Sequence, residues 1–386
     1  MPPPFKTPAF RAALDDLLAS AAWRVADAGE VQATAQRISD GDGPGWAAAW
    51  TGTATHAREL GARAAADGRR VSAREAYLRA STYFAAAAAQ VPHERARSLW
   101  EEQRACWDDA ITFLDPPGEP FEIPYEGTTL PGWLFRAAGS DDARRRPLVI
   151  VNNGTRETTT AMLVRGGAAA AARGHHWLTF DGPGQNAAFL RQGIPLRPDW
   201  ERVITPVVDR AVRFGGIDRG RIALLGAGTG GYLAARAAAF EKRLAATVAE
   251  PGIWELRAPL LAMLDARLQA LLAARDRERF DDRADRLPVA LETALRPLGI
   301  ESPYDCFRAL EDYSLDGVAE RITTPVLVTE SEEDPWPGHP RRVYDAARGP
   351  KAYVRFTTYE GAGARWRGLA VREQRIFDWV ETMLAV

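Results

Sequence analysis

The spacing of apolar residues changes about a third of the way along the chain. Up to residue 115 they recur three and four positions apart, as in 10–18 and 46–50, which is typical of amphipathic helices. Residues 72–75 read Ser-x-x-Glu, a capping box that predicts the start of a helix. We therefore predict a helical N-terminal domain over residues 1–115. Its aromatic-rich helices either pack for stability or form part of a substrate pocket wall.

Short apolar runs separated by helical segments follow. A proline-rich stretch at 115–120 breaks the helical pattern, and 121–125 with 130–135 read as a hairpin. Further apolar runs of strand length lie at 148–151, 177–180, 222–225, 244–249, 326–329 and 353–356. Because these runs alternate with helical segments, we predict an α/β fold whose mostly parallel sheet carries helices on both faces.

Residues 252–318 interrupt this alternation with segments at 256–274 and 281–295 that we predict to be helical. An insertion after the sixth predicted strand is a natural place for a lid. The chain would then divide into the N-terminal helical domain and a core over residues 116–386 that contains this lid.

The composition excludes several classes of protein. The formal net charge of the 386 residues is only -2, and no basic stripe favours nucleic acid or an anionic membrane. No run approaches the roughly 20 apolar residues that span a bilayer, and the first residues lack the apolar segment of a signal peptide. With two cysteines and no disulfide pattern, we expect a cytoplasmic protein. Dense Ala and Arg usage suggests a GC-rich, and hence bacterial, source.

One glycine-rich turn carries the clearest chemical signal. An apolar run from Arg221 stops at the sequence Gly226-Ala227-Gly228-Thr229-Gly230, and an Ala-rich helical segment follows at once. A strand, sharp turn and helix in this order form the G-x-S-x-G elbow, which holds a nucleophilic serine at the top of a sheet. Here Gly228 takes the place of the serine.

From Phe121 onward the chain resembles the α/β-hydrolase fold, and more narrowly its bacterial branch with a helical N-terminal domain, which includes esterase-like and carbon–carbon-bond hydrolases. Besides the elbow, the matching stretches are 151–154, Phe180-Asp181-Gly182-Pro183-Gly184-Gln185, 197–200, 249–252 and 360–363. The resemblance implies a sheet of the eight-stranded type and a Ser-Asp-His triad in that chain order.

Two members of the implied triad are missing. The serine position is Gly228, and Arg365 stands about where the histidine belongs, whereas the acid is retained as Asp334 after the seventh strand. Losses at two separate places indicate a natural change. His339, five residues past Asp334, is an alternative as a displaced base, or else an exposed turn residue. Thr229 is a weak candidate nucleophile, because its side chain should point away from the substrate carbonyl.

The backbone of the elbow does not need the serine. The resemblance implies that the amides of Thr229 and of the Asn153-Gly154 loop still converge as an oxyanion hole, next to the positive end of the following helix. Charged residues follow the strand ends around this point: Arg156, Glu157, Asp181, Glu250, Glu332, Asp334 and Arg365. We expect Asp334 and Glu250 to act as acid or base, and Arg365 either to orient an anion or to pair with Asp334. Glu157 and Asp181 are secondary candidates, and Asp181 is more often structural in such a turn.

Three functions follow for a small-molecule site of this kind. In the first, an enzyme removes a proton next to a carbonyl and promotes an elimination or a cyclisation of a polyketide-like natural-product intermediate. Such an elimination, with acetate leaving, is attributed to α/β-hydrolase-like enzymes of tetronate pathways. The second is a non-catalytic pseudo-hydrolase that binds a small molecule or a partner, and the third is a hydrolase with a non-standard nucleophile or base. We expect no metal or nucleotide cofactor, since the chain has no HExxH or Walker motif, and a homodimer stays open.

Overall fold

The structure is a computed structural model that describes residues 5–91, 93–141, 143–155, 157–284, 287–332, 334–360 and 369–385. In these residues one sheet of eight strands has the order β1-β2-β4-β3-β5-β6-β7-β8. The strands are β1 Glu119–Tyr125, β2 Thr128–Phe135, β3 Arg146–Asn152, β4 His176–Phe180, β5 Ile217–Ala227, β6 Ala246–Glu250, β7 Val326–Ser331 and β8 Lys351–Phe356. The β1–β2 hairpin pairs antiparallel and β2 joins β4 antiparallel, while β4, β3 and β5 to β8 are parallel. The predicted α/β-hydrolase fold is confirmed.

Both faces of the sheet are covered because its central strands are apolar throughout. Along β3, Leu148 and Ile150 belong to one buried cluster, and Val149 and Val151 to another, as the two-residue period of a strand requires. The first cluster continues into α9 (Glu201–Ala211) and α10 (Gly230–Ala238). The second continues into α7 (Ala168–Ala172) and α17 (Leu369–Leu384).

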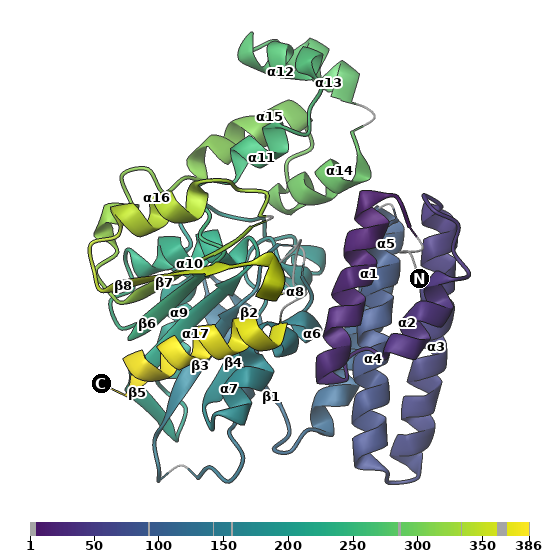
Figure 1. The fold of residues 1–386 in the computed structure, drawn as a ribbon, viewed down its shortest axis with the longest axis vertical. Coiled ribbons are helices and arrows are strands. Elements are labelled where there is room, and N and C mark those ends of the chain that lie inside the picture. Colours follow the sequence, from purple (N-terminus) through teal and green to yellow (C-terminus); the bar gives the residue numbers. More distant parts are fainter. Residues whose placement is uncertain are drawn as a thin grey trace.

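The helices before β1 form a separate layer beside the sheet, on the right of Figure 1. We call them the helical layer: α1 Pro8–Ser20, α2 Ala28–Ala35, α3 Gly43–Ala66, α4 Arg70–Ala88 and α5 His93–Thr112. Their own buried cluster is rich in aromatic side chains, including Trp46, Trp50 and Tyr83. The predicted domain boundary near residue 115 falls between α5 and β1, and the division into two domains stays a prediction.

The capping box expected at Ser72 is wrong. Helix α4 already begins at Arg70, with Arg69 at its N-cap and no capping side chain, so Ser72 lies inside the helix. The chain reverses tightly after α3 through Gly68, which has a φ of 70°. Because this turn is so short, the N-cap lies three residues before the position that the Ser-x-x-Glu pattern indicates.

The insertion between β6 and β7 is helical, as predicted, and projects from one end of the molecule (Figure 1). We call its helices the inserted helices: α11 Arg257–Leu261, α12 Ala266–Ala273, α13 Arg277–Ala284, α14 Val289–Leu295 and α15 Pro303–Ala309. The single helix expected over 256–274 is wrong. It is broken because Asp265 caps α12, accepting hydrogen bonds from the amides of Arg267 and Leu268 at 2.9 and 2.8 Å. None of the helices in the described ranges has the length and apolar character needed to cross a membrane.

The close approach of β5 to α10 tolerates no side chain at Gly226. A Cβ atom there would overlap the carbonyl oxygen of Gly230 and lie 2.6 Å from the Cβ of Ala234. We predict that Gly226→Ala lowers the free energy of unfolding by at least about 2 kcal/mol. The control is Gly52→Ala in α3, where nothing lies within 4 Å of the added atom and helix propensity should add about 1 kcal/mol. Urea unfolding measures both, and equal effects would contradict the prediction.

Candidate active site

The turn between β5 and α10 has the backbone of a nucleophile elbow. Strand β5 ends at Ala227, Gly228 has a φ of 62°, and α10 begins at Gly230. The amide of Gly231 donates to the Gly228 carbonyl at 2.9 Å, which closes the turn. A serine elbow needs the same left-handed conformation, and glycine adopts it without strain.

The carboxylate of Glu157 lies over this glycine. A Cβ atom on Gly228 would lie only 2.6 Å from Glu157 Oε1, and one on Gly154 would overlap Glu157 Oε2. The carboxylate therefore occupies the space into which a side chain at position 228 would project. Glu157 Oε2 is buried and accepts no hydrogen bond from any described residue. A buried oxygen without a partner requires an explanation, and a role in catalysis is one of the few available.

Two amide side chains hold the backbone of Glu157. Asn153 Nδ2 and Asn186 Nδ2 donate to the Glu157 carbonyl at 2.9 and 3.3 Å. The next residue, Thr158, is the N-cap of α6 (Thr159–Met162), and its side chain accepts from the amide of Ala161. These contacts fix the backbone on the C-terminal side of Glu157, and the side chain lies over Gly154 and Gly228.

The three residues expected to form the oxyanion hole lie together. Asn153 and Gly154 follow β3, and Thr229 follows the neighbouring β5, at adjacent ends of paired strands. Thr229 Oγ1 accepts the amide hydrogen of Thr155 at 2.9 Å, so the hydroxyl joins the elbow to the loop after β3. The structure thus brings Asn153, Gly154, Thr229 and Glu157 to one place, and the role of the amides as an oxyanion hole stays a prediction.

Asp334 lies after β7, at the same end of the sheet. Its Oδ2 accepts the amide hydrogen of Ser331 at 2.7 Å, and its own amide donates to the Ser331 carbonyl at 3.1 Å. Burial raises the pKa of Asp334 to about 6, against the effect of the Ser331 amide. A carboxyl group that titrates near neutral pH is suited to acid–base chemistry.

Glu250 has a partner that the sequence did not indicate. It ends β6 and forms a buried ion pair with Arg372 of α17, whose Nη2 also donates to the Arg165 carbonyl at 3.3 Å. Burial lowers the pKa of Arg372 to about 9. Because the guanidinium of Arg372 contacts both oxygens of this carboxylate, Glu250 is a weaker candidate for a base.

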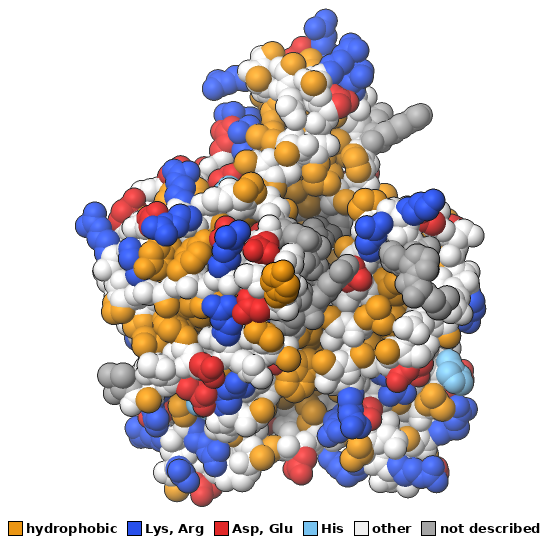
Figure 2. All heavy atoms as spheres, viewed as in Figure 1, with side chains coloured by type: hydrophobic (Ala, Val, Ile, Leu, Met, Phe, Trp, Pro, Cys, Tyr) orange, Lys and Arg blue, Asp and Glu red, His pale blue; other side chains and the backbone are white. Residues whose placement is uncertain are grey.

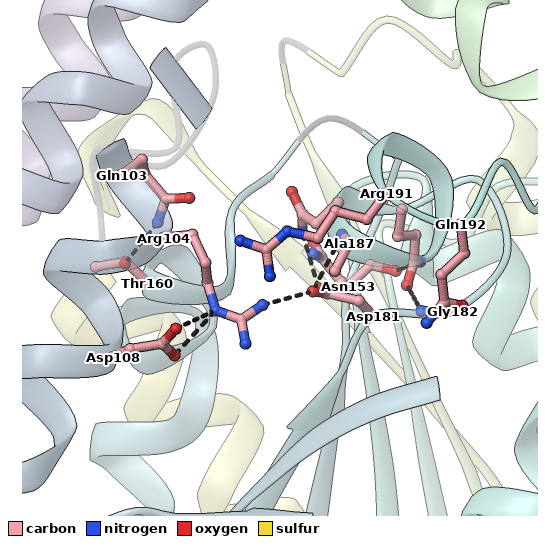
Figure 3. A network of polar contacts seen from close by, with 12 residues as sticks. Gln103, Arg104, Asp108, Asn153, Thr160, Asp181, Gly182, Ala187, Arg191 and Gln192 are labelled. Carbon is pink, nitrogen blue, oxygen red and sulfur yellow. Dashed lines mark hydrogen bonds and ion pairs between the residues drawn. The ribbon is translucent and has the colours of Figure 1, made fainter. Parts of the chain in front are cut away.

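Asp181 is fully buried at the end of β4. Asn186 Nδ2 donates to its Oδ1 at 2.9 Å, and Arg104 of the helical layer lies 3.6 Å from its Oδ2 (Figure 3). Burial raises the pKa of Asp181, although Arg104 and Asn186 oppose this. These contacts give Asp181 a structural setting, and a direct catalytic role stays a prediction.

His339 begins α16 (His339–Ala346). Its Nδ1 accepts the amide hydrogen of Trp254 at 3.3 Å, its Nε2 lies 3.9 Å from Glu255 Oε1, and burial lowers its pKa. These contacts face Trp254 and Glu255, and a role as displaced base stays a prediction.

Arg365 and Arg156 lie outside the described residues. Within the described ranges, no three His, Cys, Asp or Glu side chains gather as a metal site would require.

Sequence reasoning missed Arg104, Arg372 and Asn186. The two arginines lie far along the chain from their carboxylate partners, among many arginines of similar helices, so no local signal distinguishes them. Asn186 follows the glycine turn after β4 and has a φ of 29°. Such strain is costly in a residue other than glycine, but the sequence gives no sign of it.

The sheet order and the elbow define an α/β-hydrolase-fold protein. No protein-family model matches the chain. Hydrolase acrC of Aspergillus aculeatus is 30% identical over 96% of this chain and 95% of its own, and alpha/beta hydrolase xenA of Xenoacremonium sinensis is 31% identical over 86% and 83%. The chain belongs to the α/β-hydrolase family. These relatives are fungal, and the expected bacterial branch stays a prediction.

Other similar proteins cover less of the chain or show the fold alone. The 20-hydroxy-prefusarin hydrolase FUS2 of Gibberella moniliformis is 32% identical over 58% of this chain and 55% of its own. Among solved structures, 2,6-dihydroxy-pseudo-oxynicotine hydrolase has a TM-score of 0.75 with 20% identity and covers 95% of both chains. AbyA5 has a TM-score of 0.62 with 20% identity over 98% of both chains.

The raised pKa of Asp334 predicts a dependence of stability on pH. Its folded pKa of about 6 exceeds the value of about 4 in an unfolded chain, so the folded state binds the proton more tightly. The stabilisation is present below about pH 4 and is lost as the pH rises through about 6. Asp334→Asn removes this titration and keeps an acceptor for the Ser331 amide. We therefore compare the free energy of unfolding of the variant with that of the wild type at each pH. We expect the difference, variant minus wild type, to be about 2 kcal/mol larger at about pH 7 than at about pH 4. Urea unfolding across this range measures it, and parallel curves would contradict it.

The ion pair of Glu250 and Arg372 predicts a second effect on stability. Glu250→Gln leaves a buried guanidinium without its carboxylate, and we expect the free energy of unfolding to fall by about 3–5 kcal/mol. Replacing both partners by apolar residues, as Glu250→Leu with Arg372→Met, should recover most of this loss, because neither member of the pair is then left as a buried charge without its partner. Thermal or urea unfolding of the single and double variants tests this. A double variant as unstable as the single variant would show that the pair is not the cause.

Proposed function

We propose that this chain is an α/β-hydrolase-fold enzyme without the serine nucleophile, and that it catalyses a base-promoted, non-hydrolytic step on a carbonyl compound. The observation that carries the proposal is the position of Glu157. Its carboxylate fills the space over Gly228 in which the attacking hydroxyl of a hydrolase would stand. The site thus presents a base in place of a nucleophile.

The reaction is an elimination or a cyclisation. Glu157 removes a proton from the carbon next to the substrate carbonyl, and the electron pair left behind forms an enolate. In an elimination this pair becomes the new carbon–carbon double bond as a carboxylate departs with the electrons of its carbon–oxygen bond. In a cyclisation the enolate carbon instead attacks an electrophilic carbon of the same molecule.

The negative charge that develops on the carbonyl oxygen needs stabilisation in either case. The amides of Gly154 and Thr229 and the N-terminus of α10 are the groups placed for this task. Asp334, with its pKa of about 6, is the second candidate for proton transfer, as acid or as base. Glu250 is a weaker candidate because Arg372 holds its carboxylate.

The apolar side chains of the insertion between β6 and β7 indicate the class of substrate. The insertion between β6 and β7 exposes the apolar side chains of Met263, in the turn between α11 and α12, and of Val289, at the start of α14. Figure 2 shows hydrophobic side chains gathered where the lobe of these helices joins the rest of the molecule. We infer a predominantly apolar, polyketide-like substrate, with the inserted helices as a lid. The name of FUS2 shows that one relative acts on a natural-product-like compound, which supports the same class.

Hydrolysis is the second candidate function, favoured by the names of the relatives. In that reaction Glu157 would activate a water molecule as general base, and no covalent intermediate would form. The two functions need the same carboxylate and differ in whether a carbon–carbon double bond or an added water appears in the product.

The test is turnover of two simple probes, a β-acetoxy ketone and p-nitrophenyl acetate. We expect the wild type to release acetate from the ketone with an equal amount of enone, and Glu157→Gln to lower this rate by about 10²–10⁴-fold. Glu122→Gln, which neutralises an exposed carboxylate on the edge strand β1, is the matched control and should leave the rate unchanged.

Each other outcome identifies a different function. Glu157-dependent hydrolysis of the ester without enone formation would favour the hydrolase. Turnover that Glu157→Gln leaves intact would refute Glu157 as the base. A protein that binds the ketone without turning it over would be a non-catalytic binding protein.

A further inference from the structure

We propose that Arg104, on helix α5 of the helical layer, is a positioning residue for Glu157 and acts through Asp181 and Asn186. The inference rests on the proposed function, since it assigns Arg104 a part in placing the base. It also gives the helical layer a task beyond covering the sheet.

Arg104 is buried where α5 meets the core. Its Nε donates to both carboxylate oxygens of Asp108 at 2.9 and 3.0 Å, and its guanidinium lies 4.3 Å from the ring centre of Trp133. Held from two sides, it directs Nη1 at Asp181 Oδ2, 3.6 Å away, as Figure 3 shows. Nη1 makes no hydrogen bond to any described residue, so the ion pair with Asp181 is its described contact.

Asp181, in turn, accepts a hydrogen bond from Asn186. Asn186 Nδ2 donates to Asp181 Oδ1 at 2.9 Å and to the Glu157 carbonyl at 3.3 Å. One side-chain amide thus joins the buried carboxylate to the backbone of the proposed base. The φ of Asn186 is 29°, a conformation that persists only where the surroundings enforce it. The bond to Asp181 is one such constraint.

The same helix also contacts the segment that follows Glu157. Gln103, the neighbour of Arg104, donates from Nε2 to Thr160 Oγ1 at 3.2 Å, and Ser81 of α4 lies 2.7 Å from the same hydroxyl. Thr160 belongs to α6, directly after Glu157. Contacts from the helical layer therefore reach the segment that carries the carboxylate at two points, indirectly at the Glu157 carbonyl and directly at the Thr160 hydroxyl.

Charge explains why the arginine matters. Burial alone favours the protonated form of Asp181, and Arg104 opposes it. Without the cation, Asp181 would have an increased tendency to protonate and would lose acceptor strength toward Asn186. The hold on the Glu157 carbonyl would then loosen, although no atom of the elbow had been changed. A displacement of about 1 Å in a catalytic group can lower a rate about a hundredfold.

The experiment compares Arg104→Gln with Arg191→Gln in the full-length protein. Arg191 joins the same two parts of the molecule, pairing with Glu101 and lying 5.1 Å from the ring centre of Trp100. The charge of Asp181 acts on Arg191, but in the described part of the chain Arg191 makes no hydrogen bond or ion pair to Asp181 or Asn186. Both variants remove one arginine from this interface. Urea unfolding reports whether their losses of stability are similar.

The readout specific to positioning is the carboxyl carbon of Glu157. In protein labelled with ¹³C at the glutamate carboxyl groups, the Glu157 resonance is the one that disappears in Glu157→Gln. We expect Arg104→Gln to shift this resonance, and Arg191→Gln to shift it much less. Arg104→Lys retains a cation beside Asp181 and should restore the resonance toward its wild-type position.

Turnover of the β-acetoxy ketone provides the second arm. We expect Arg104→Gln to lower kcat by about tenfold to a hundredfold with little change in KM, as for a displaced catalytic group.

An unchanged Glu157 resonance in folded Arg104→Gln would overturn the inference and leave Arg104 as an interface residue. If the wild type turns over neither probe, the proposed function fails, whereas the resonance still decides whether Arg104 positions Glu157. Should Arg104→Gln not fold, Arg104→Lys and Asp181→Asn are compared by the same resonance, and a wild-type signal in both overturns the inference.

Discussion

The site depends on the contact between a carboxylate and a glycine. Because Gly228 has no side chain, Glu157 can lie against the turn after β5, and while it lies there no side chain fits at position 228. The backbone of the elbow, the adjoining loop after β3 and the start of α10 are arranged as a serine enzyme requires. We propose that this exchange of a hydroxyl for a carboxylate converts a site for attack into a site for proton removal.

Arginines from distant helices pair with some of the acidic residues at this end of the sheet and not with others. Glu250 pairs with Arg372 of α17, and Asp181 with Arg104 of α5. Glu157 and Asp334 form no ion pair among the described residues. A paired buried carboxylate supports the structure, since its charge is already balanced. The two without a guanidinium partner are the ones that we propose for proton transfer.

The sequence predicted the fold well because the fold is repetitive. Apolar runs of strand length, the helical segments between them and the glycine turn after Leu225 each carry a local signal, and they appear in the expected order. Helix limits were less predictable where a short turn or a capping Asp265 decided them.

The site could be predicted only in outline. The elbow and the residues around it were identified, but Glu157 was placed second to Asp334 and Glu250, because nothing local shows which carboxylate an arginine neutralises. Arg104 and Arg372 reach their partners only through tertiary packing, and Asn186 acts through a backbone conformation that no residue pattern encodes.

The most direct test is a crystal structure of the wild-type protein with a ketone that resembles the β-acetoxy substrate but has no leaving group. The account predicts the Glu157 carboxylate between Gly228 and the carbon next to the carbonyl, with the ketone oxygen toward the amides of Gly154 and Thr229. A carboxylate turned away from the elbow, or a ketone oxygen directed away from those amides, would contradict it.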